Sequence, residues 1–373
     1  MNLERLFCPN IDCPARGQIR KGNLTIHSQQ EKRCHCKVCG QTFAITKGTL
    51  FYRLRTDPKI VMCVIILLAN GCPLPAIVKA FGRDERTVKE WWRRAGTHCE
   101  AVHHHVVGQS QLDLQQVQAD EIKAKVQGGH LWLAMAIMVR TRLWLGGAVS
   151  PRRDLALIQA LADQIRAIAL CRPLLLAVAG LPSYVKAFQR AFRSRLLRPG
   201  KQGRPQLIAW PDIAIVQVMK RRRPTGLAIE RRIVQGCAHQ VQRLHQLTQK
   251  VPGVINTAYI ERLNATFRSH LAWLTRRART LAQQPETLTA GLFVLGCFYN
   301  FCDTHHSLRL RLSVGRYGHR WVQRTPAIAT GLTDHVWTVD ELLRYKVPPP
   351  RWSPPKRRGR PSKETLQLVK RWC

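Results

Sequence analysis

The sequence predicts an α/β fold in which a mixed sheet is flanked by helices and preceded by two smaller amino-terminal elements. Apolar runs separated by turns predict successive strands, and apolar residues at helical spacing predict the helices between them. A later, fully apolar run predicts a buried strand that lies parallel to its neighbours. Strands followed by helices in this order indicate a layered α/β domain. The predicted strands span 114–119, 131–139, 143–149 and 173–179, and the predicted helices span 154–169 and 185–192.

The charge of the chain predicts a polyanionic partner. Its 373 residues include 60 Lys and Arg against 22 Asp and Glu, a formal net charge of +38. An excess this large repels itself in a compact chain, and it is spread along the whole length, which favours nucleic acid over a membrane surface. The length allows two or three domains. The predicted domains are 1–50, 55–108, 112–315 and a basic tail at 316–373.

Localisation is predicted from the amino terminus, the hydropathy and the cysteines. The first residues lack the charged-then-apolar layout of a signal peptide. The longest apolar runs, at 60–69 and 131–139, are shorter than the ~20 residues that span a bilayer. Thirteen scattered cysteines, an odd number, argue against a secreted disulfide scaffold. We expect an intracellular, DNA-associated protein with no membrane partner, in the cytoplasm or nucleoid if the host is bacterial.

Two cysteine pairs predict a zinc ribbon over residues 1–50. Cys8 and Cys13 form the first pair, and Cys36 and Cys39 form the second. Two tight turns at such spacing can aim four thiolates at one tetrahedral zinc ion, and four thiolates leave no open position, so the zinc would be structural. Unliganded buried cysteines are the alternative. Cys34 is expected to stand outside the site.

Residues 55–108 predict a helix-turn-helix, with helices at 58–69, 74–81 and 85–95. Gly82 supplies the turn and Asp84 can cap the third helix. The outer face of the third helix is basic, as expected of a helix that enters the major groove. The residues expected to contact DNA there are Arg86, Lys89 and Arg93. An ordinary helical packing unit is the alternative, and the run His103–His105 is assigned to a linker.

A second stretch of interest is a helix predicted from residue 256 to 284, which contains no Gly or Pro. At 3.6 residues per turn, Glu261, Asn264 and Arg268 share one stripe while the apolar residues lie elsewhere. A carboxylate, an amide and a guanidinium on one face could bind a metal ion, a polar backbone and a phosphate. A solvated polar face is the alternative.

Four short motifs, in order, carry a family resemblance. They are Gln118-Ala-Asp-Glu121; Gly180-Leu-Pro-Ser-Tyr184; Ile260-Glu-Arg-Leu-Asn264 with Arg268; and Thr325-Pro-Ala327 with Gly331-Leu-Thr-Asp-His335. Together with the cysteine ribbon and the helix-turn-helix, they make most of the chain resemble a DDE transposase of the insertion-sequence-one type. The resemblance implies an RNase H-like domain at 112–315, terminal inverted repeats in double-stranded DNA as partner, and self-association on that DNA.

The resemblance also implies the roles of the site residues. Asp120, expected at the carboxyl end of the first strand, and Glu261 would be the first and third carboxylate ligands of Mg2+, which suits oxygen ligands. Asn264 would be an extra polar residue of the site, and Arg268 a phosphate or support contact. The second carboxylate of the family is absent, because Ala179 stands where an Asp is expected.

A methyl group cannot coordinate a cation, so we expect DNA binding with little or no strand-transfer activity. Three functions therefore remain open. The first is a metal-dependent transposase that is impaired by Ala179, the second a non-catalytic repressor derived from a transposase, and the third a non-specific packaging protein. A footprint on inverted repeats without cleavage would select the second, and salt-sensitive general coating the third.

The remaining segments carry weaker patterns. A loop is predicted at 199–205, a strand at 213–219, a basic turn at 220–224, and helices at 238–250 and 285–300. In the tail, Arg358-Gly-Arg360-Pro resembles an AT-hook, whose arginines enter the minor groove. Simple phosphate attraction is the alternative for these arginines. A short helix is predicted at 363–373.

Overall fold

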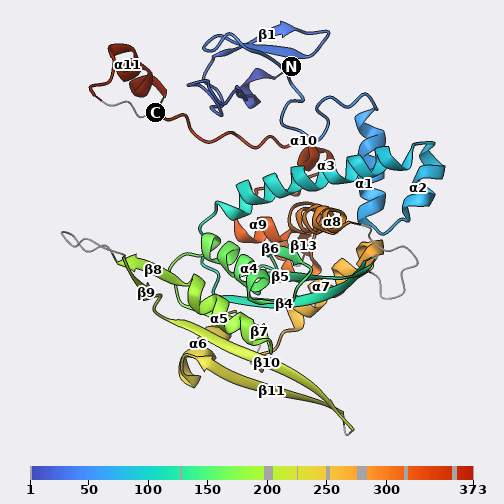
Figure 1. Cartoon of the computed structure of the whole chain (residues 1–373), viewed down its shortest axis with the longest axis vertical. Helices are drawn as coiled ribbons and strands as arrows, with labels where there is room; N and C mark the ends of the chain where they lie inside the picture. Colours follow the sequence, from blue (N-terminus) through green and yellow to red (C-terminus); the bar gives the residue numbers. More distant parts are fainter. Residues whose placement is uncertain are drawn as a thin grey trace. The chain divides into compact units, whose positions relative to one another are not determined.

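Figure 1 shows the computed structural model of the chain. The structure describes residues 2–126, 128–196, 205–224, 226–248, 253–274, 284–314, 318–354 and 359–372. The chain forms two compact units. The first combines Met1–Ile60 with Leu343–Cys373, and the second is Val61–Leu342. In the described parts of the chain, no helix is long and apolar enough to cross a membrane.

The first unit is built on a small antiparallel sheet in the order β1-β2-β3. Its strands are β1 (Leu24–Ser28), β2 (Arg33–Cys36) and β3 (Thr42–Ala44), and a 3-10 turn precedes them at Leu3–Arg5. Cysteines make up much of its buried core. The carboxyl-terminal helix α11 (Lys363–Trp372) forms as predicted and belongs to this unit.

Three helices begin the second unit. They are α1 (Pro58–Ala69), α2 (Leu74–Phe81) and α3 (Glu85–His103). Gly82 takes the left-handed conformation that ends α2, and the Asp84 carboxylate accepts the Thr87 N–H to cap α3. The helix α3 is longer than predicted. It continues through Gly96, where a Cβ would lie 2.4 Å from Ala290, so this glycine allows close packing and does not end the helix.

The prediction that the three histidines form a linker is therefore wrong. His103 is the last residue of α3, and His104–Gly108 form a π-helical turn that follows it directly. His103 is buried, and its ring packs 4.5 Å from the Trp144 ring. Burial of His103 against apolar side chains stabilises the helix at this point. The polar sequence His-His-His gives no sign of this burial.

A six-stranded mixed sheet in the order β11-β10-β7-β4-β5-β6 is the centre of the second unit and confirms the α/β class (Figure 1). The strands are β4 (Gln116–Val126), β5 (Gly129–Met138), β6 (Trp144–Ser150), β7 (Leu174–Ala179), β10 (Ile213–Arg223) and β11 (Gly226–Gln235). The strand β7 lies between β4 and β10 and is parallel to both, while the other pairs are antiparallel. The buried, fully apolar β7 is the parallel strand that the sequence predicts.

Helices cover both faces of this sheet. They are α4 (Leu155–Ile168), α5 (Pro182–Ala191), α6 (Ala238–Thr248), α7 (Ala258–His270) and α8 (Pro285–Cys297), the last continued by a π-helical turn at Phe298–Cys302. The face with Gln116 and Gln118 bonds to α6 and to the start of α7. The opposite face bonds to α5 through Glu121 and Tyr184.

Some predicted boundaries are wrong. The strand β4 runs on to Val126, so Asp120 lies in its middle and not at its carboxyl end. The strand β10 continues to Arg223, where a basic turn was expected, and pairs with β11 as a long hairpin. The charged residues at the end of β10 break the apolar pattern, so the sequence does not predict this extension of the strand. A second unpredicted hairpin pairs β8 (Arg193–Leu196) with β9 (Gln206–Ala209).

The end of the second unit contains short elements. They are a 3-10 turn at His306–Leu308, the hairpin strands β12 (Leu310–Val314) and β13 (Gly318–Val322), and the helices α9 (Pro326–Thr330) and α10 (Val339–Arg344). Within the Thr325 motif, the threonine hydroxyl caps α9 and Gly331 ends it. The helix predicted to run to 284 ends at His270, followed by a 3-10 turn at Ala272–Leu274. The rest of that prediction, residues 275–283, lies outside the described residues.

Candidate functional site

Gln118 sets the position of the candidate site, because its buried side chain fixes the start of α7 against β4. Its Oε1 accepts the N–H groups of Tyr259 and Ile260, both at 3.0 Å, and its Nε2 donates to the Asn256 carbonyl at 2.7 Å. The first N–H groups of a helix have no partner within the helix, so a buried amide that accepts two of them holds the helix in place. Gln118 opens one of the four sequence motifs, but this role was not predicted from the sequence.

Asp120 lies two residues further along β4 and therefore faces the same side as Gln118. Asn264, one turn past Glu261 on α7, donates from Nδ2 to Asp120 Oδ2 at 3.0 Å. Burial and the nearby charge of Glu121 raise the pKa of Asp120 to about 7. The structure thus brings together two of the predicted site residues that are 144 positions apart.

Glu261 is held at the edge of the same cluster. Its carboxylate accepts hydrogen bonds from the Thr257 hydroxyl and from the ammonium of Lys220 on β10. The two charged side chains are partly exposed, 33% for Lys220 and 43% for Glu261, so water reaches this pair. The charge of Glu261 also raises the pKa of Asp120, with a smaller effect than burial and Glu121. Arg268 follows in the last turn of α7 and is partly exposed.

The strand register places Ala179 beside Asp120. Ala119 pairs with Val178, so the next residue pair along these parallel strands is Asp120 and Ala179. Ala179 in turn pairs with Val218 of β10, two residues before Lys220. Because side chains alternate along a strand, Asp120, Ala179 and Lys220 face the same side, the side on which α7 carries Glu261 and Asn264. A methyl group occupies the middle of this cluster.

Glu121 points to the opposite face of β4, where it is held by two partners. The Tyr184 hydroxyl donates to its Oε2 at 2.8 Å, and Arg153 Nε donates to its Oε1 at 2.6 Å. The Glu121 side chain is only 2% exposed, so this charge depends on those partners. Burial, followed by the charge of Glu121, raises the pKa of Tyr184 well above its usual value. Tyr184 in the Gly180–Tyr184 motif thereby buttresses the strand that carries Asp120.

The acidic cluster does not complete a magnesium site. Two carboxylates and an amide are present, and in the described part of the chain no group donates to the buried Oδ1 of Asn264. That orphaned oxygen suits a cation or a donor, but the second carboxylate is replaced by Ala179 and Glu261 already pairs with an ammonium. The residues therefore do not fit the two-ion arrangement that phosphodiester chemistry requires.

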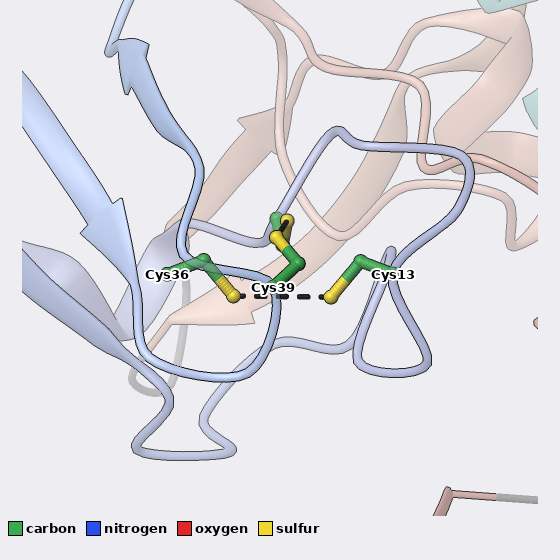
Figure 2. Close-up of side chains that lie close together, drawn as sticks. Cys13, Cys36 and Cys39 are labelled. Atoms are coloured by element: carbon green, nitrogen blue, oxygen red, sulfur yellow. Dashed lines mark hydrogen bonds between the residues drawn. The ribbon is translucent and has the colours of Figure 1, made fainter.

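Among the described residues, four cysteines form a group that could hold a metal ion such as zinc, and Figure 2 labels Cys13, Cys36 and Cys39 of this group. Their Sγ atoms all lie within 4.8 Å of one another, with 3.7 Å between Cys8 and Cys39 and 3.8 Å between Cys13 and Cys36. Zn–S bonds of about 2.3 Å in a tetrahedron place sulfur atoms about 3.8 Å apart. The pairs predicted from spacing are thus confirmed to converge, and Cys34 is outside the group, as expected.

The environment of Cys36 favours a thiolate. Burial opposes ionisation, but the backbone N–H groups of Cys39 and Val38, with the Asn23 amide at 3.3 Å, lower the pKa of Cys36 to about 7. Burial raises the pKa of Cys13 to about 12 in the absence of a metal ion. A divalent cation would reverse this, since it favours the charged form of every ligand.

The residues predicted to contact DNA are exposed where the structure describes them. On α3, Lys89 pairs with Glu85 and Arg93 with Glu90, each at 2.7 Å, and Arg86 is exposed. This face borders a pocket of about 350 Å³. Arg360 is exposed in the tail. Arg358 lies outside the described residues.

Comparisons with protein-family models and with curated proteins find no match to this chain. The resemblance to the DDE transposases therefore rests on the motifs and on the residues that surround them.

Proposed function

We propose that this chain is a DNA-binding protein of the DDE transposase type, with an RNase H-like domain whose strand-cleavage and strand-transfer chemistry is impaired. Its partner is the double-stranded DNA of the terminal inverted repeats of a mobile element. A non-catalytic repressor that occupies such repeats is the alternative, and the same residues bear on both.

The observation that carries the proposal is the placement of Asp120, Ala179, Glu261 and Asn264 on one face of the sheet. The two acids, from a central strand and a distant helix, match the first and third carboxylates of the family arrangement, and Ala179 stands at the end of a parallel strand in place of the second. A pKa shift at a buried carboxylate with a specific partner is typical of functional sites.

Nucleic acid as the partner is supported by the charge of the chain. The net charge of +38 is distributed over both units and attracts phosphate backbones at long range. A helix-turn-helix reading of α1 to α3 is supported by the short α2, the Gly82 turn and the capped α3. The pairing of Lys89 and Arg93 with glutamates lowers the net charge of that face, so we assign the larger share of the affinity to other basic surfaces.

Two residues support impaired chemistry and favour the repressor alternative. Ala179 removes an anionic ligand, and Lys220 neutralises Glu261 without a metal ion. In the protein as it stands, Asn264 orients Asp120, Gln118 holds α7, and Lys220 balances the charge of Glu261.

The test compares the chain as written with Ala179→Asp and with the uncharged, isosteric Ala179→Asn. The DNA is a labelled duplex of each end that flanks the coding segment, probed by footprinting and by Mg2+-dependent nicking. We expect a footprint from all three proteins and nicking from Ala179→Asp alone. Absence of any footprint would overturn DNA recognition, and equal nicking by the chain as written would overturn the impairment.

A further inference from the structure

The two ends of the chain meet in the first unit, although nearly 300 residues separate them. The Leu50 N–H donates to the Leu343 carbonyl at 3.1 Å, so the exit of the ribbon segment is tied to the start of the tail. The Arg344 guanidinium lies over the Phe51 ring at 4.7 Å. Lys346 is half-buried in the same unit, and burial lowers its pKa to about 8. These contacts attach the tail at its beginning.

The rest of the described tail is held by the turn that carries the first cysteine pair. Arg16 donates from Nε to the Pro350 carbonyl at 2.6 Å and from Nη2 to the Arg351 carbonyl at 3.0 Å. Gln18 donates from Nε2 to the Trp372 carbonyl at 3.0 Å. Because these hydrogen bonds go to backbone carbonyls, they hold the backbone of the tail and do not depend on the side chains of the tail.

Gly17, between these two anchors, explains how closely the tail approaches. A Cβ at this position would lie 2.9 Å from the Pro349 carbonyl oxygen, and its φ of +67° suits glycine. The Trp372 side chain packs against the core cluster that contains the buried cysteines. The tail is therefore docked at several separate points.

The anchors depend on the cysteine turn for their position. The Arg16 N–H donates to the Cys13 carbonyl at 3.0 Å, and the Gly17 N–H donates to the Cys8 carbonyl at 3.1 Å. A metal ion bound to Cys8 and Cys13 would fix the two carbonyls that orient Arg16 and Gly17. Structural metal binding contributes directly to folding in small ribbons, so loss of the ion should release the anchors as well.

Both ends of the chain are strongly basic. Residues 1–60 contain eleven Lys and Arg against four Asp and Glu, and residues 343–373 contain ten against one. Docking two such segments against each other costs electrostatic energy unless a polyanion is shared between them. Holding both in place before binding lowers the entropy cost of contacting one partner with two segments.

We propose that the metal-loaded cysteine ribbon holds the carboxyl-terminal segment in place, so that both chain ends contact one DNA duplex as a single surface. The proposal rests on the proposed DNA binding and adds where a large part of it occurs. It assigns the cysteine site an indirect role, since the ion orders the basic tail and need not approach DNA.

The experiment uses the full chain and the double variant Arg16→Ala/Gln18→Ala, which keeps all four cysteines. The matched control is Lys21→Ala/Gln29→Ala, which also removes one cation and one amide but alters exposed residues of the ribbon. Hydrogen exchange reports the protection of the tail, metal analysis reports zinc, and fluorescence anisotropy with a 20-bp duplex reports affinity at several salt concentrations. A zinc-chelated sample of the unaltered chain is measured beside them.

We expect the anchor variant to keep one zinc ion and a protected sheet while the tail loses protection, and chelation to release both. Affinity of the anchor variant should fall about tenfold below the control, within the range that linked binding segments provide. Equal tail protection in the anchor variant and the control would overturn the docking. A released tail with unchanged affinity would overturn the shared surface, whereas absence of DNA binding by the unaltered chain would instead remove the proposed function and, with it, this role.

Discussion

Asp120→Asn should make the metal-free chain more stable at neutral pH. Burial and the charge of Glu121 raise the Asp120 pKa from its usual 3.8 to about 7. Between pH 3.8 and 7, Asp120 therefore binds a proton in the folded state more tightly than in the unfolded state. Its contribution to the free energy of unfolding is greatest below pH 3.8 and is lost as the pH rises to 7. Three pKa units correspond to about 4 kcal/mol, an upper value for the cost of the ionised carboxylate at pH 8.

Asparagine has the shape of the protonated acid and keeps an oxygen to accept from Asn264. We expect Asp120→Asn to exceed the unaltered chain in free energy of unfolding by a few kcal/mol at pH 8 and to match it at pH 4. Denaturant unfolding followed by tryptophan fluorescence, without added Mg2+, measures the difference. Asp163→Asn on the exposed face of α4 is the control and should show no such gap.

The prediction would be refuted if the two proteins had the same free energy of unfolding at pH 8, or if their difference were the same at pH 8 and pH 4. Only a proton bound to Asp120 in the folded state makes the two free energies equal in acid. A stabilised variant would also carry functional meaning. A residue whose removal strengthens the fold is present for a purpose other than stability.

Three further outcomes are expected. Tyr184→Phe removes a donor from the buried Glu121 carboxylate and should lower the free energy of unfolding by about 1.5–3 kcal/mol, and an unchanged value would contradict the buttress. Burial, with a smaller effect of the neighbouring histidine charge, lowers the pKa of His103 to about 3. The neutral ring therefore contributes fully to the stability of the fold above pH 6.5, the usual pKa of histidine. Below pH 6.5 the free energy of unfolding should fall by about 1.4 kcal/mol per pH unit. His103→Phe should remove this part of the acid sensitivity in thermal melts between pH 7 and 5. Metal analysis should find one zinc equivalent in the unaltered chain and in Cys34→Ser, and none in Cys39→Ser.

Local patterns predicted much of the fold because they depend on neighbours in sequence. The helices α1 and α2 have the predicted boundaries, since an apolar run ends at Gly71 in one case and at Gly82 in the other. The cysteine group was found from two spacings, because each tight turn brings its own pair together. Such signals need no knowledge of the rest of the chain.

Other elements were missed because their cause lies in distant partners. The strand β10 continues through charged residues since β11 pairs with it, and no apolar alternation marks either strand. The helix α3 continues past Gly96 because Ala290 of α8 packs against that glycine. Propensity assigns both stretches to turns or linkers, and tertiary packing overrides it.

Some features of the candidate site were predicted from local patterns, and others were missed because they depend on distant partners. The stripe on α7 and the acid pair on β4 were visible in sequence, and the structure brings Asp120 and Asn264 into contact. Their roles in chemistry stay predictions. The roles of Gln118 and Lys220 were not predicted, since each side chain acts on a residue at least 41 positions away and neither belongs to a periodic pattern.

Ala179 and Lys220 both reduce the negative charge of the acidic cluster. The methyl group avoids a third carboxylate beside Asp120, and the ammonium balances Glu261. Restoring Ala179→Asp adds a negative charge next to a carboxyl group whose pKa is already raised to about 7, which should raise the pKa of Asp120 further. The restored variant should therefore be less stable than the unaltered chain when metal-free and should gain stability on addition of Mn2+, while Ala179→Asn should do neither. Thermal melts with and without Mn2+ measure both changes. A restored carboxylate that neither weakens the metal-free chain nor creates a response to Mn2+ would show that Ala179 does not lie between the two acids in a shared electrostatic site.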